Sequence, residues 1–507
     1  MLSPLVILSI VVGYFALLCL ISRWTSQQAD NQTFFTGNRD SKWYLVAFGM
    51  IGTSLSGVTF ISVPGWVATS QFSYMQMVLG YLLGYAVIAF ILLPLYYRMG
   101  LTSIYTYLET RMGPRAYQTG AGFFLLSRTI GASFRLYLVA IVFQFILEKA
   151  GWTPPFALPV ALSIAAIYLY TYRGGIRTVV FTDTLQTFFM LASVGLTVAW
   201  IARDMSSQGA GMIEAIQQSS YSQIFFWESG PKNFFLQCLS GAFIAIVMTG
   251  LDQDMMQKNL TCRNLKEAQW NMMSFSSVLV IVNLGFLALG ALLYLYGHQQ
   301  GILEESTSSG TFQLLVQDKG TGEMIARGTD YLFPILAIDY LPAWVGLLFI
   351  LGLVAAAYSS ADSALTALTT SFCIDFLKLD STQTKAAEAS RIRQRVQLGF
   401  CLVLFATICV FQQLQNAAII AQIFKAAGFT YGPLLGLYGF GMFTRRNVRD
   451  GGVLWVCLAA ASTSFLLNQM APTWFGITIG FEILLYNGGL TFLGLWLISR
   501  KSDLETA

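Results

Sequence analysis

Charged side chains lie inside apolar segments of this chain, where water cannot solvate them. Two aspartates, Asp183 and Asp362, and three basic residues, Arg128, Arg135 and Lys425, interrupt runs of Leu, Ile, Val and Phe. Ionised side chains inside a membrane are costly, and they usually face a cavity or an opposite charge. These residues are therefore candidates for handling an ion or a solute, although Arg128 and Arg135 equally fit structural pairing with an acid.

Two clusters of small polar residues lie in the same kind of segment. The first is Gly52-Thr53-Ser54-Leu55-Ser56-Gly57-Val58-Thr59, and the second is Ala356-Ala357-Tyr358-Ser359-Ser360-Ala361-Asp362-Ser363. Because a helix rises about 1.5 Å per residue, both clusters and Asp183 are expected at one depth in the cytoplasmic half. They offer hydroxyls, carboxylates and, if the glycine-rich segment is unwound, main-chain carbonyls. Oxygen ligands without His or Cys suit an alkali cation.

The composition requires a bilayer around most of the chain. Of 507 residues, 55% are hydrophobic and only 11% are charged, whereas soluble domains carry about 25% charged residues. A membrane-crossing helix needs about 20 apolar residues. Thirteen such runs lie near 3–22, 45–69, 72–97, 117–147, 155–172, 175–202, 233–254, 270–297, 343–373, 394–412, 417–442, 452–470 and 475–499. We therefore predict an all-α integral membrane protein with about 13 transmembrane helices.

The distribution of lysine and arginine gives the orientation. With the N-terminus outside, 21 of these residues, Lys258 among them, fall in or beside inner loops and 5 in outer loops, as the positive-inside rule requires. The C-terminus is then cytoplasmic. The first apolar run is expected to be a retained helix, since Arg23 follows it and no basic residue precedes it. The acidic outer loop 298–342 is expected to contain only short helices.

Several function classes lack the residues they need. The net charge is only +4 and the basic residues are scattered, which argues against a nucleic-acid partner. A single histidine, His298, and cysteines without CxxC pairs give no metal centre or catalytic base of the usual kinds. No P-loop is present. Asp252 and Asp254 are expected at a solvated inner helix end.

At the polar clusters the chain resembles the sodium:solute symporter family over nearly its whole length. The motifs that carry the resemblance follow one another in family order: Ser54-Leu55-Ser56-Gly57-Val58-Thr59-Phe60 with Pro64-Gly65, Tyr107-Leu108-Glu109-Thr110-Arg111, Gly174-Gly175-Ile176 with Thr182-Asp183 and Gln186, Gln253-Asp254 with Gln257, and Ala355-Ala356-Ala357-Tyr358-Ser359-Ser360-Ala361-Asp362-Ser363.

The resemblance implies a leucine-transporter-type fold, in which two inverted repeats of five helices enclose a site at broken helices. The expected parts are residues 1–44, a leading helix and inner loop; 45–203, repeat one; 204–443, repeat two with the outer loop; and 444–507, two further helices and a short cytoplasmic tail. The common sodium site of the family maps to the carbonyls of Gly52, Leu55 and Ala356 and the hydroxyls of Ser359 and Ser360.

A second sodium or proton site, present in some members, maps to Asp183, Asp362 and Ser363, together with Ser359. Asp362 departs from the Ser or Thr usual there, so the ion stoichiometry stays open. The residues expected at the solute are Ser56, Gly57, Thr59, Gln76, Arg135, Gln253 and Lys425. Gln76 and Arg135 lie close to, but out of register with, the residues that grip sialic acid in sialic acid transporters.

The implied function is secondary active uptake of a small polar organic solute coupled to Na⁺. Sugars, sialic acid, amino acids and other carboxylates are all open as the solute. The expected location is the plasma membrane, as in a bacterial inner membrane, with lipid as the main surrounding and a monomer as the working unit. The alternatives are a proton-coupled symporter using Asp183 or Asp362, and a membrane sensor that keeps the fold. The family resemblance does not imply an enzyme.

Overall fold

The computed structural model describes residues 4–27, 30–149, 151–207, 211–308, 311–317, 322–379, 386–414, 419–476 and 479–501. Within them the chain is mostly helical. The helices are α1 (Pro4–Thr25), α2 (Asn31–Thr36), α3 (Trp43–Ser54), α4 (Gly57–Ser70), α5 (Tyr74–Val87), α6 (Leu93–Arg98), α7 (Thr106–Met112), α8 (Pro114–Lys149), α9 (Ala157–Thr171), α10 (Gly175–Ser207), α11 (Met212–Gln218), α12 (Phe234–Ala245), α13 (Gln253–Asn259), α14 (Leu265–Gln299), α15 (Leu332–Ile335), α16 (Ala343–Ser371), α17 (Ala386–Leu414), α18 (Ile419–Phe443), α19 (Val453–Phe475) and α20 (Ile483–Ile498). The strands are β1 (Leu303–Ser308), β2 (Thr311–Gln317), β3 (Met324–Arg327), β4 (Asn447–Val448) and β5 (Ser499–Arg500).

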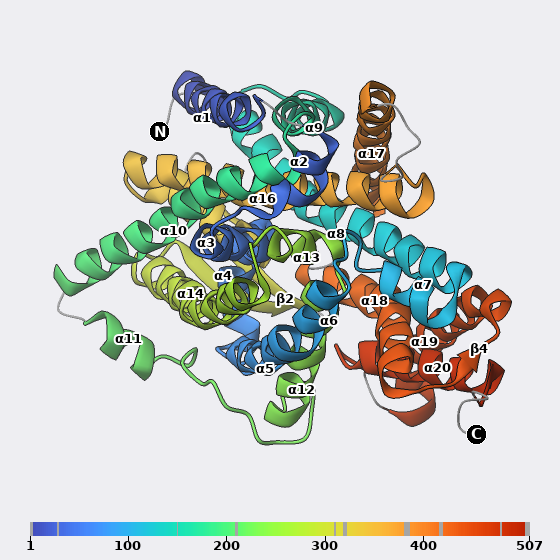
Figure 1. The fold of residues 1–507 in the computed structure, drawn as a ribbon. Helices are drawn as coiled ribbons and strands as arrows, with labels where there is room; N and C mark the ends of the chain where they lie inside the picture. Colours follow the sequence, from blue (N-terminus) through green and yellow to red (C-terminus); the bar gives the residue numbers. More distant parts are fainter. Residues whose placement is uncertain are drawn as a thin grey trace.

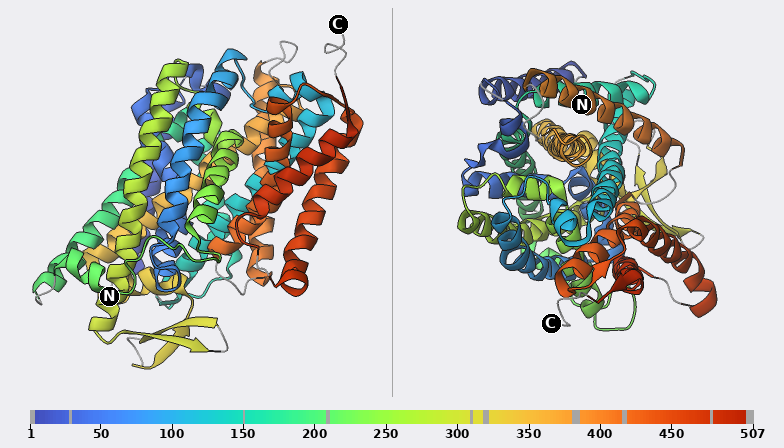
Figure 2. Two further views of the ribbon diagram at one scale, coloured as in Figure 1. Left: turned by 90° about the horizontal axis from the view of Figure 1, so that it is seen from below. Right: turned by 45° about the vertical axis from the view of Figure 1, so that its right-hand side comes forward.

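The long helices form one bundle around α16. Figure 1 shows α16 among α10, α3 and α8, and these helices pack against it. In the side view of Figure 2 the helices run between two faces, and the N- and C-terminal ends lie at opposite faces. Every residue from Gly352 to Ser371 of α16 is buried. A helix buried on all sides belongs to the core of a large bundle, so α16 is the element against which the candidate site is built.

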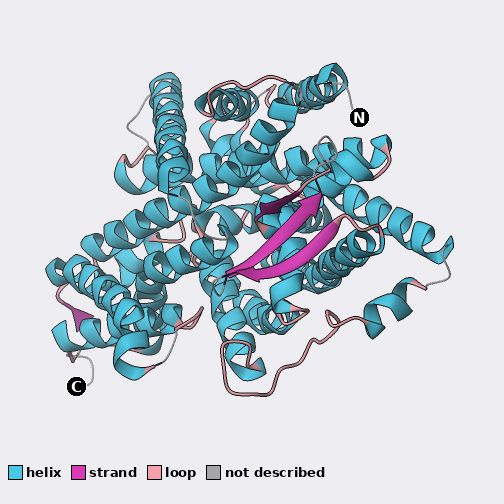
Figure 3. Ribbon diagram, turned by 180° about the vertical axis from the view of Figure 1, so that it is seen from behind, coloured by secondary structure: helices cyan, strands magenta, loops and turns pink. Residues whose placement is uncertain are grey.

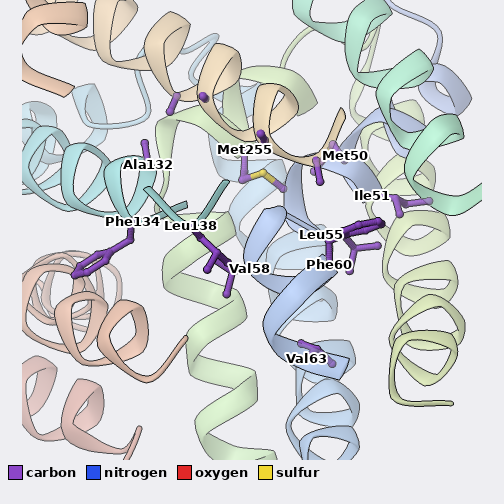
Figure 4. Packing of buried hydrophobic residues seen from close by; sticks show 14 of the residues in the cluster. Met50, Ile51, Leu55, Val58, Phe60, Val63, Ala132, Phe134, Leu138 and Met255 are labelled. Carbon is purple, nitrogen blue, oxygen red and sulfur yellow. The ribbon is translucent and has the colours of Figure 1, made fainter. Parts of the chain in front are cut away.

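Two spans are broken rather than continuous. The chain bends by 55° between α3 and α4 and by 70° between α12 and α13. The first break falls in the polar cluster where unwinding was expected, and Figure 4 shows Leu55 and Val58 on its two sides. The second corrects our expectation of one continuous run over 233–254. Its cause is local, because the Asp252 side chain accepts hydrogen bonds from the N–H groups of Asp254 and Met255 and so starts a new helix.

The number of membrane crossings is only partly established. Eight of the described helices are long and apolar enough to cross a membrane, or up to ten if each bent pair forms one span. α9 and α20 are apolar but shorter. Every predicted apolar run overlaps at least one described helix, but the run 475–499 begins too early, since α19 extends to Phe475 and α20 starts only at Ile483. Residues 3, 417–418 and 477–478 of these runs lie outside the described residues. The total of thirteen and the inverted repeat stay predictions.

The outer loop 298–342 contains a sheet, which corrects both the expectation of short helices alone and a purely α fold. β1, β2 and β3 form an antiparallel sheet in that order, seen from behind in Figure 3. In β2, Leu314 and Val316 are buried. This alternation has the two-residue period of a strand and not that of a helix, and sequence reasoning overlooked it. The helical part of the loop is α15 with two short neighbouring turns.

A hydrogen-bonded group attaches the sheet to the bundle. Glu305 accepts hydrogen bonds from the Tyr221 hydroxyl at 2.7 Å and from His298 Nε2 at 3.3 Å. The bond from His298 lowers the pKa of the Glu305 carboxyl. The single histidine therefore has a structural contact at the outer end of α14.

Glycines allow α5 and α12 to approach closely. A Cβ at Gly80 would lie 2.0 Å from the Cys238 carbonyl oxygen, and one at Gly241 would lie 2.2 Å from the Met77 carbonyl oxygen. Small residues at such crossings permit backbone contact between membrane helices. The packing of the two helices therefore depends on the absence of these side chains.

We expect Gly80→Ala to destabilise the protein by about 1–3 kcal/mol, the usual cost of overpacking a tight contact. Gly195→Ala is the matched control, because nothing lies within 4 Å of a Cβ at this exposed position of α10. The measurement is the fraction of detergent-solubilised protein that stays monodisperse after heating. Equal melting temperatures for the two variants would contradict the close-packing interpretation.

Candidate ion and solute site

The break between α3 and α4 leaves main-chain carbonyls without helical partners. Leu55 N–H donates to Ile51 at 2.8 Å and Phe60 N–H donates to Ser56 at 3.0 Å. No donor among the described residues reaches the carbonyls of Gly52 or Leu55. Free carbonyl oxygens inside a membrane protein are tolerated where they face a cavity or a cation. The break therefore presents the two predicted carbonyl ligands.

The serines of α16 meet this break. Ser359 Oγ lies 3.4 Å from Thr53 Oγ1 of α3 and donates to Asp183 Oδ1 of α10 at 2.6 Å. Ser360 Oγ is buried and has no hydrogen-bond partner in the part of the chain that the structure describes. The structure thus brings α3, α10 and α16 together as the depth argument predicted. Ala356 lies one turn before Ser360 on the same buried face of α16.

The carboxylate of Asp183 has a partner that sequence reasoning missed. Lys258 Nζ lies 2.5 Å from Asp183 Oδ2, and both side chains are buried. Lys258 also donates a hydrogen bond to the Thr53 hydroxyl. The placement of Lys258 in an inner loop was wrong, because the second helix break turns α13 into the bundle. The sequence did contain a signal for this pair. Asp183 was expected inside the membrane, and a buried carboxylate needs a cation, which here had to come from a distant part of the chain.

The three residues predicted for a second ion face different partners. Asp183 contacts Lys258, as above. Asp362 Oδ2 accepts a hydrogen bond from the Tyr170 hydroxyl at 2.7 Å, while its Oδ1 has no partner. Ser363 Oγ donates to Asp254 Oδ1. The structure therefore does not show these three side chains sharing one ligand shell.

A second buried ion pair joins α8 to α13. Arg128 contacts Asp254, and its Nη1 lies 3.9 Å from Asp252 Oδ2. Tyr431 of α18 donates to Asp252 Oδ2 at 2.5 Å. Both aspartates are fully buried, so the expectation of a solvated helix end was wrong. Asp252 caps the first turn of α13, and the two aspartates neutralise the charge of Arg128, because the second half of the broken helix starts inside the bundle.

A cavity opens beside the first break. Ser56, Thr59 and Arg135 line it, together with Tyr74, Tyr81, Tyr85, Thr249 and Asn283. Gly57, also predicted at the solute, does not line the cavity but packs against α8, where a Cβ would meet Val139 Cγ2 at 2.8 Å. Within the described part of the chain, Arg135 has no hydrogen bond or ion pair. The cavity therefore combines hydroxyls and aromatic rings with two arginines, Arg128 and Arg135, of which Arg135 has no ion pair within the described residues.

Three other predicted solute residues lie elsewhere. Gln76 donates to the Lys232 carbonyl at 2.9 Å and accepts from Phe226 N–H at 3.1 Å, which fixes the segment before α12. Gln253 donates to a carbonyl in the loop before α7 at 2.8 Å. Lys425 is exposed on α18. None of the three lines the cavity.

The model of the sodium:solute symporter family matches residues 34–459. The chain belongs to the sodium:solute symporter family. Among its relatives, the sodium/sialic acid symporter NanT of Aliivibrio fischeri is 24% identical over 86% of this chain and 82% of its own length. The sodium/sialic acid symporter SiaT of Proteus mirabilis is 23% identical over 89% and 87%. The human sodium/iodide cotransporter is 23% identical over 85% and 65%.

The fold of this symporter agrees with that assignment. A Na⁺-coupled sialic acid symporter, solved in a substrate-bound outward-open state, superposes with a TM-score of 0.79 at 18% identity and covers 98% of this chain and 99% of its own. Mhp1, a nucleobase-cation-symport-1 transporter, superposes with a TM-score of 0.52 at 13% identity over 91% and 93%. The protein is an integral membrane transporter that couples movement of a small organic solute to Na⁺.

We expect Arg128→Met to destabilise this symporter by about 3–5 kcal/mol, because it leaves two buried carboxylates without their cation. Asp254→Asn in the same chain should restore part of the loss. Arg263→Met is the control, since its pair with Asp40 is exposed and such pairs contribute about 0–1 kcal/mol. Thermal denaturation in detergent measures all three, and equal losses for Arg128→Met and Arg263→Met would contradict a buried pair.

Proposed function

We propose that this symporter takes up a small organic anion, a carboxylate, together with Na⁺ bound at the break between α3 and α4. The single observation that carries the choice of solute is Arg135, a cation that lines the cavity beside the break and makes no hydrogen bond or ion pair within the described residues. The sodium coupling itself follows from the family; the position of the ion and the chemistry of the solute are the proposal.

Oxygens without hydrogen-bond partners within the described residues support this position for the ion. The carbonyls of Gly52 and Leu55 are free of donors within the described residues, and Ser360 Oγ is buried without a partner. The Ala356 carbonyl and Ser359 Oγ complete the proposed set. These are uncharged oxygens on two helices, a donor set that fits a weakly bound alkali ion better than a transition metal.

Gly52 itself suits this role for a steric reason. A Cβ at this position would lie 2.2 Å from Thr187 Oγ1, which instead accepts a hydrogen bond from Gly52 N–H at 3.0 Å. The absence of a side chain lets α3 lie directly on α10. This contact holds the end of α3, and with it the free carbonyls, in place.

The solute is assigned by charge balance. Arg135 is half-buried; a guanidinium partly removed from water gains from a counterion, and a carboxylate can bind it through two parallel hydrogen bonds. Ser56 and Thr59 offer hydroxyls in the same cavity. Relatives of this chain include transporters named for sialic acid, monocarboxylates and iodide, all of which are anions at neutral pH. Sugars and amino acids serve below as competing solutes.

The proposed topology keeps thirteen crossings and the five-plus-five inverted repeat, with the N-terminus outside and the C-terminus cytoplasmic. The repeats would be 45–203 and 204–443, flanked by 1–44 and 444–507. Two facts support it: the chain ends lie at opposite faces of the bundle, and both helix breaks fall at the same place in the proposed repeats, in the first helix of each. A bacterial inner membrane and a monomeric working unit complete the proposal.

We expect Ser360→Ala to raise the sodium concentration for half-maximal binding about tenfold, since one oxygen ligand is lost and tenfold corresponds to about 1.4 kcal/mol. Thr369→Val is the control, because its hydroxyl only bonds to the Leu365 carbonyl of its own helix at 2.7 Å. Binding of radioactive sodium to purified protein measures both. An unchanged half-saturating concentration in Ser360→Ala would remove Ser360 from the site.

We expect Arg135→Gln to reduce uptake of a carboxylate at least tenfold and to leave sodium binding intact. The probes are radiolabelled sialic acid, lactate, glucose and proline in proteoliposomes, each with sodium and with choline in its place. Lys425→Gln, at an exposed position of α18, is the companion variant. Equal losses for the two variants would place Lys425 in the solute path as well, whereas unaltered uptake by Arg135→Gln would overturn the carboxylate assignment.

Uptake measured with choline in place of sodium also distinguishes a sodium-coupled from a proton-coupled symporter. A proton-coupled symporter using Asp183 or Asp362 would keep its uptake in choline when an inward proton gradient is supplied. The sodium-coupled protein loses uptake there. A sensor would show no uptake of any probe under either condition.

A further inference from the structure

The Asp183 carboxylate already holds a cation that belongs to the chain. Lys258 Nζ lies 2.5 Å from Asp183 Oδ2 and also contacts the Thr53 hydroxyl. Ser359 donates to the other carboxylate oxygen at 2.6 Å. All four side chains are buried. The ammonium therefore lies among the carboxylate and hydroxyl oxygens that an alkali ion at this position would use.

The contacts around Lys258 fix its position. On one side, Gln257 donates to the Phe35 carbonyl at 2.7 Å and to Thr370 Oγ1 at 3.0 Å. On the other, Asn259 accepts from Asn271 Nδ2 at 2.7 Å. These bonds attach α13 to α2, α16 and α14 immediately before and after the lysine. The hydrogen bonds of Gln257 and Asn259 thus hold the Lys258 side chain in the direction of Asp183.

At Asp183 itself, the charge of the carboxylate is then already balanced by Lys258. One lysine and one aspartate form a neutral pair, and a lysine ammonium is a compact monovalent cation whose hydrogen bonds replace ion–oxygen contacts. Adding Na⁺ beside them would place two cations next to one carboxylate in a medium of low dielectric constant. The other carboxylate nearby, Asp362, is directed to Tyr170 at 2.7 Å.

We propose that Lys258 is a tethered cation that fills the Asp183 site, where a two-ion symporter would bind its second Na⁺. This symporter therefore binds one Na⁺, at the break between α3 and α4. Lys258 thereby sets the ion stoichiometry. The inference rests on the proposed sodium site at Ser359 and Ser360, and it predicts that removing the ammonium converts Asp183 into a ligand for a second sodium ion.

The test counts radioactive sodium bound per purified wild-type protein at saturation, with no solute added. We expect one ion. Two ions bound to the wild type would overturn the role of Lys258 while leaving sodium coupling intact. No sodium bound would overturn the proposed sodium site and the Lys258 inference together.

Two variants then test whether a second sodium site forms at Asp183 when the ammonium is removed, and whether it is lost again when the carboxylate is also removed. Lys258→Ala should bind two ions, with a sodium dependence that becomes cooperative, because the freed Asp183 needs a cation. Lys258→Ala combined with Asp183→Asn is the matched control and should return to one ion. If Lys258→Ala binds one ion, the tethered-cation role is wrong. Should that variant unfold without sodium, rescue of its melting temperature by sodium, but not in the double variant, supports the proposal, and no rescue overturns it.

Discussion

Charge neutrality inside an apolar bundle is the constraint on which the rest of this structure depends. A carboxylate or guanidinium removed from water costs several kcal/mol unless an opposite charge and hydrogen bonds accompany it. The broken helix α12–α13 meets this requirement twice, since Lys258 faces Asp183 of α10 and Asp254 faces Arg128 of α8. Seven residues of α13 therefore hold together helices that are distant in sequence.

The same constraint makes Arg135 informative. Arg128, two turns earlier on the same face of α8, forms an ion pair with Asp254, while Arg135 forms no ion pair within the described residues and lines the cavity. The two arginines thus have different roles, because Arg128 contacts the acids of α13 and Arg135 does not. A transported anion that balances Arg135 would couple solute binding to the electrostatics of the site, as a sodium ion does at the carbonyls of the α3–α4 break.

The proposed ion and solute positions lie close together because the break between α3 and α4 forms part of both. Leu55 follows the end of α3 with its carbonyl free of donors within the described residues, and both Leu55 and Ser56 line the cavity. Breaking a membrane helix exposes backbone oxygens on one side and redirects side chains on the other. The buried helix α16 closes the site from behind with Ser359 and Ser360, and its small residues allow this close approach.

The sequence alone determined the membrane class, the positions of the apolar helices, the first helix break and the meeting of the Ser359 cluster with Asp183. These follow from hydrophobicity, helix rise and small polar residues, which are local properties. Only the tertiary structure showed the second break, and with it the burial of Asp252, Asp254 and Lys258. A polar segment after an apolar run has the same local pattern whether it leaves the membrane or folds back into the bundle. Partners far apart in sequence decide between these two outcomes, because Arg128 of α8 and Asp183 of α10 offset the cost of burying the charged residues of α13.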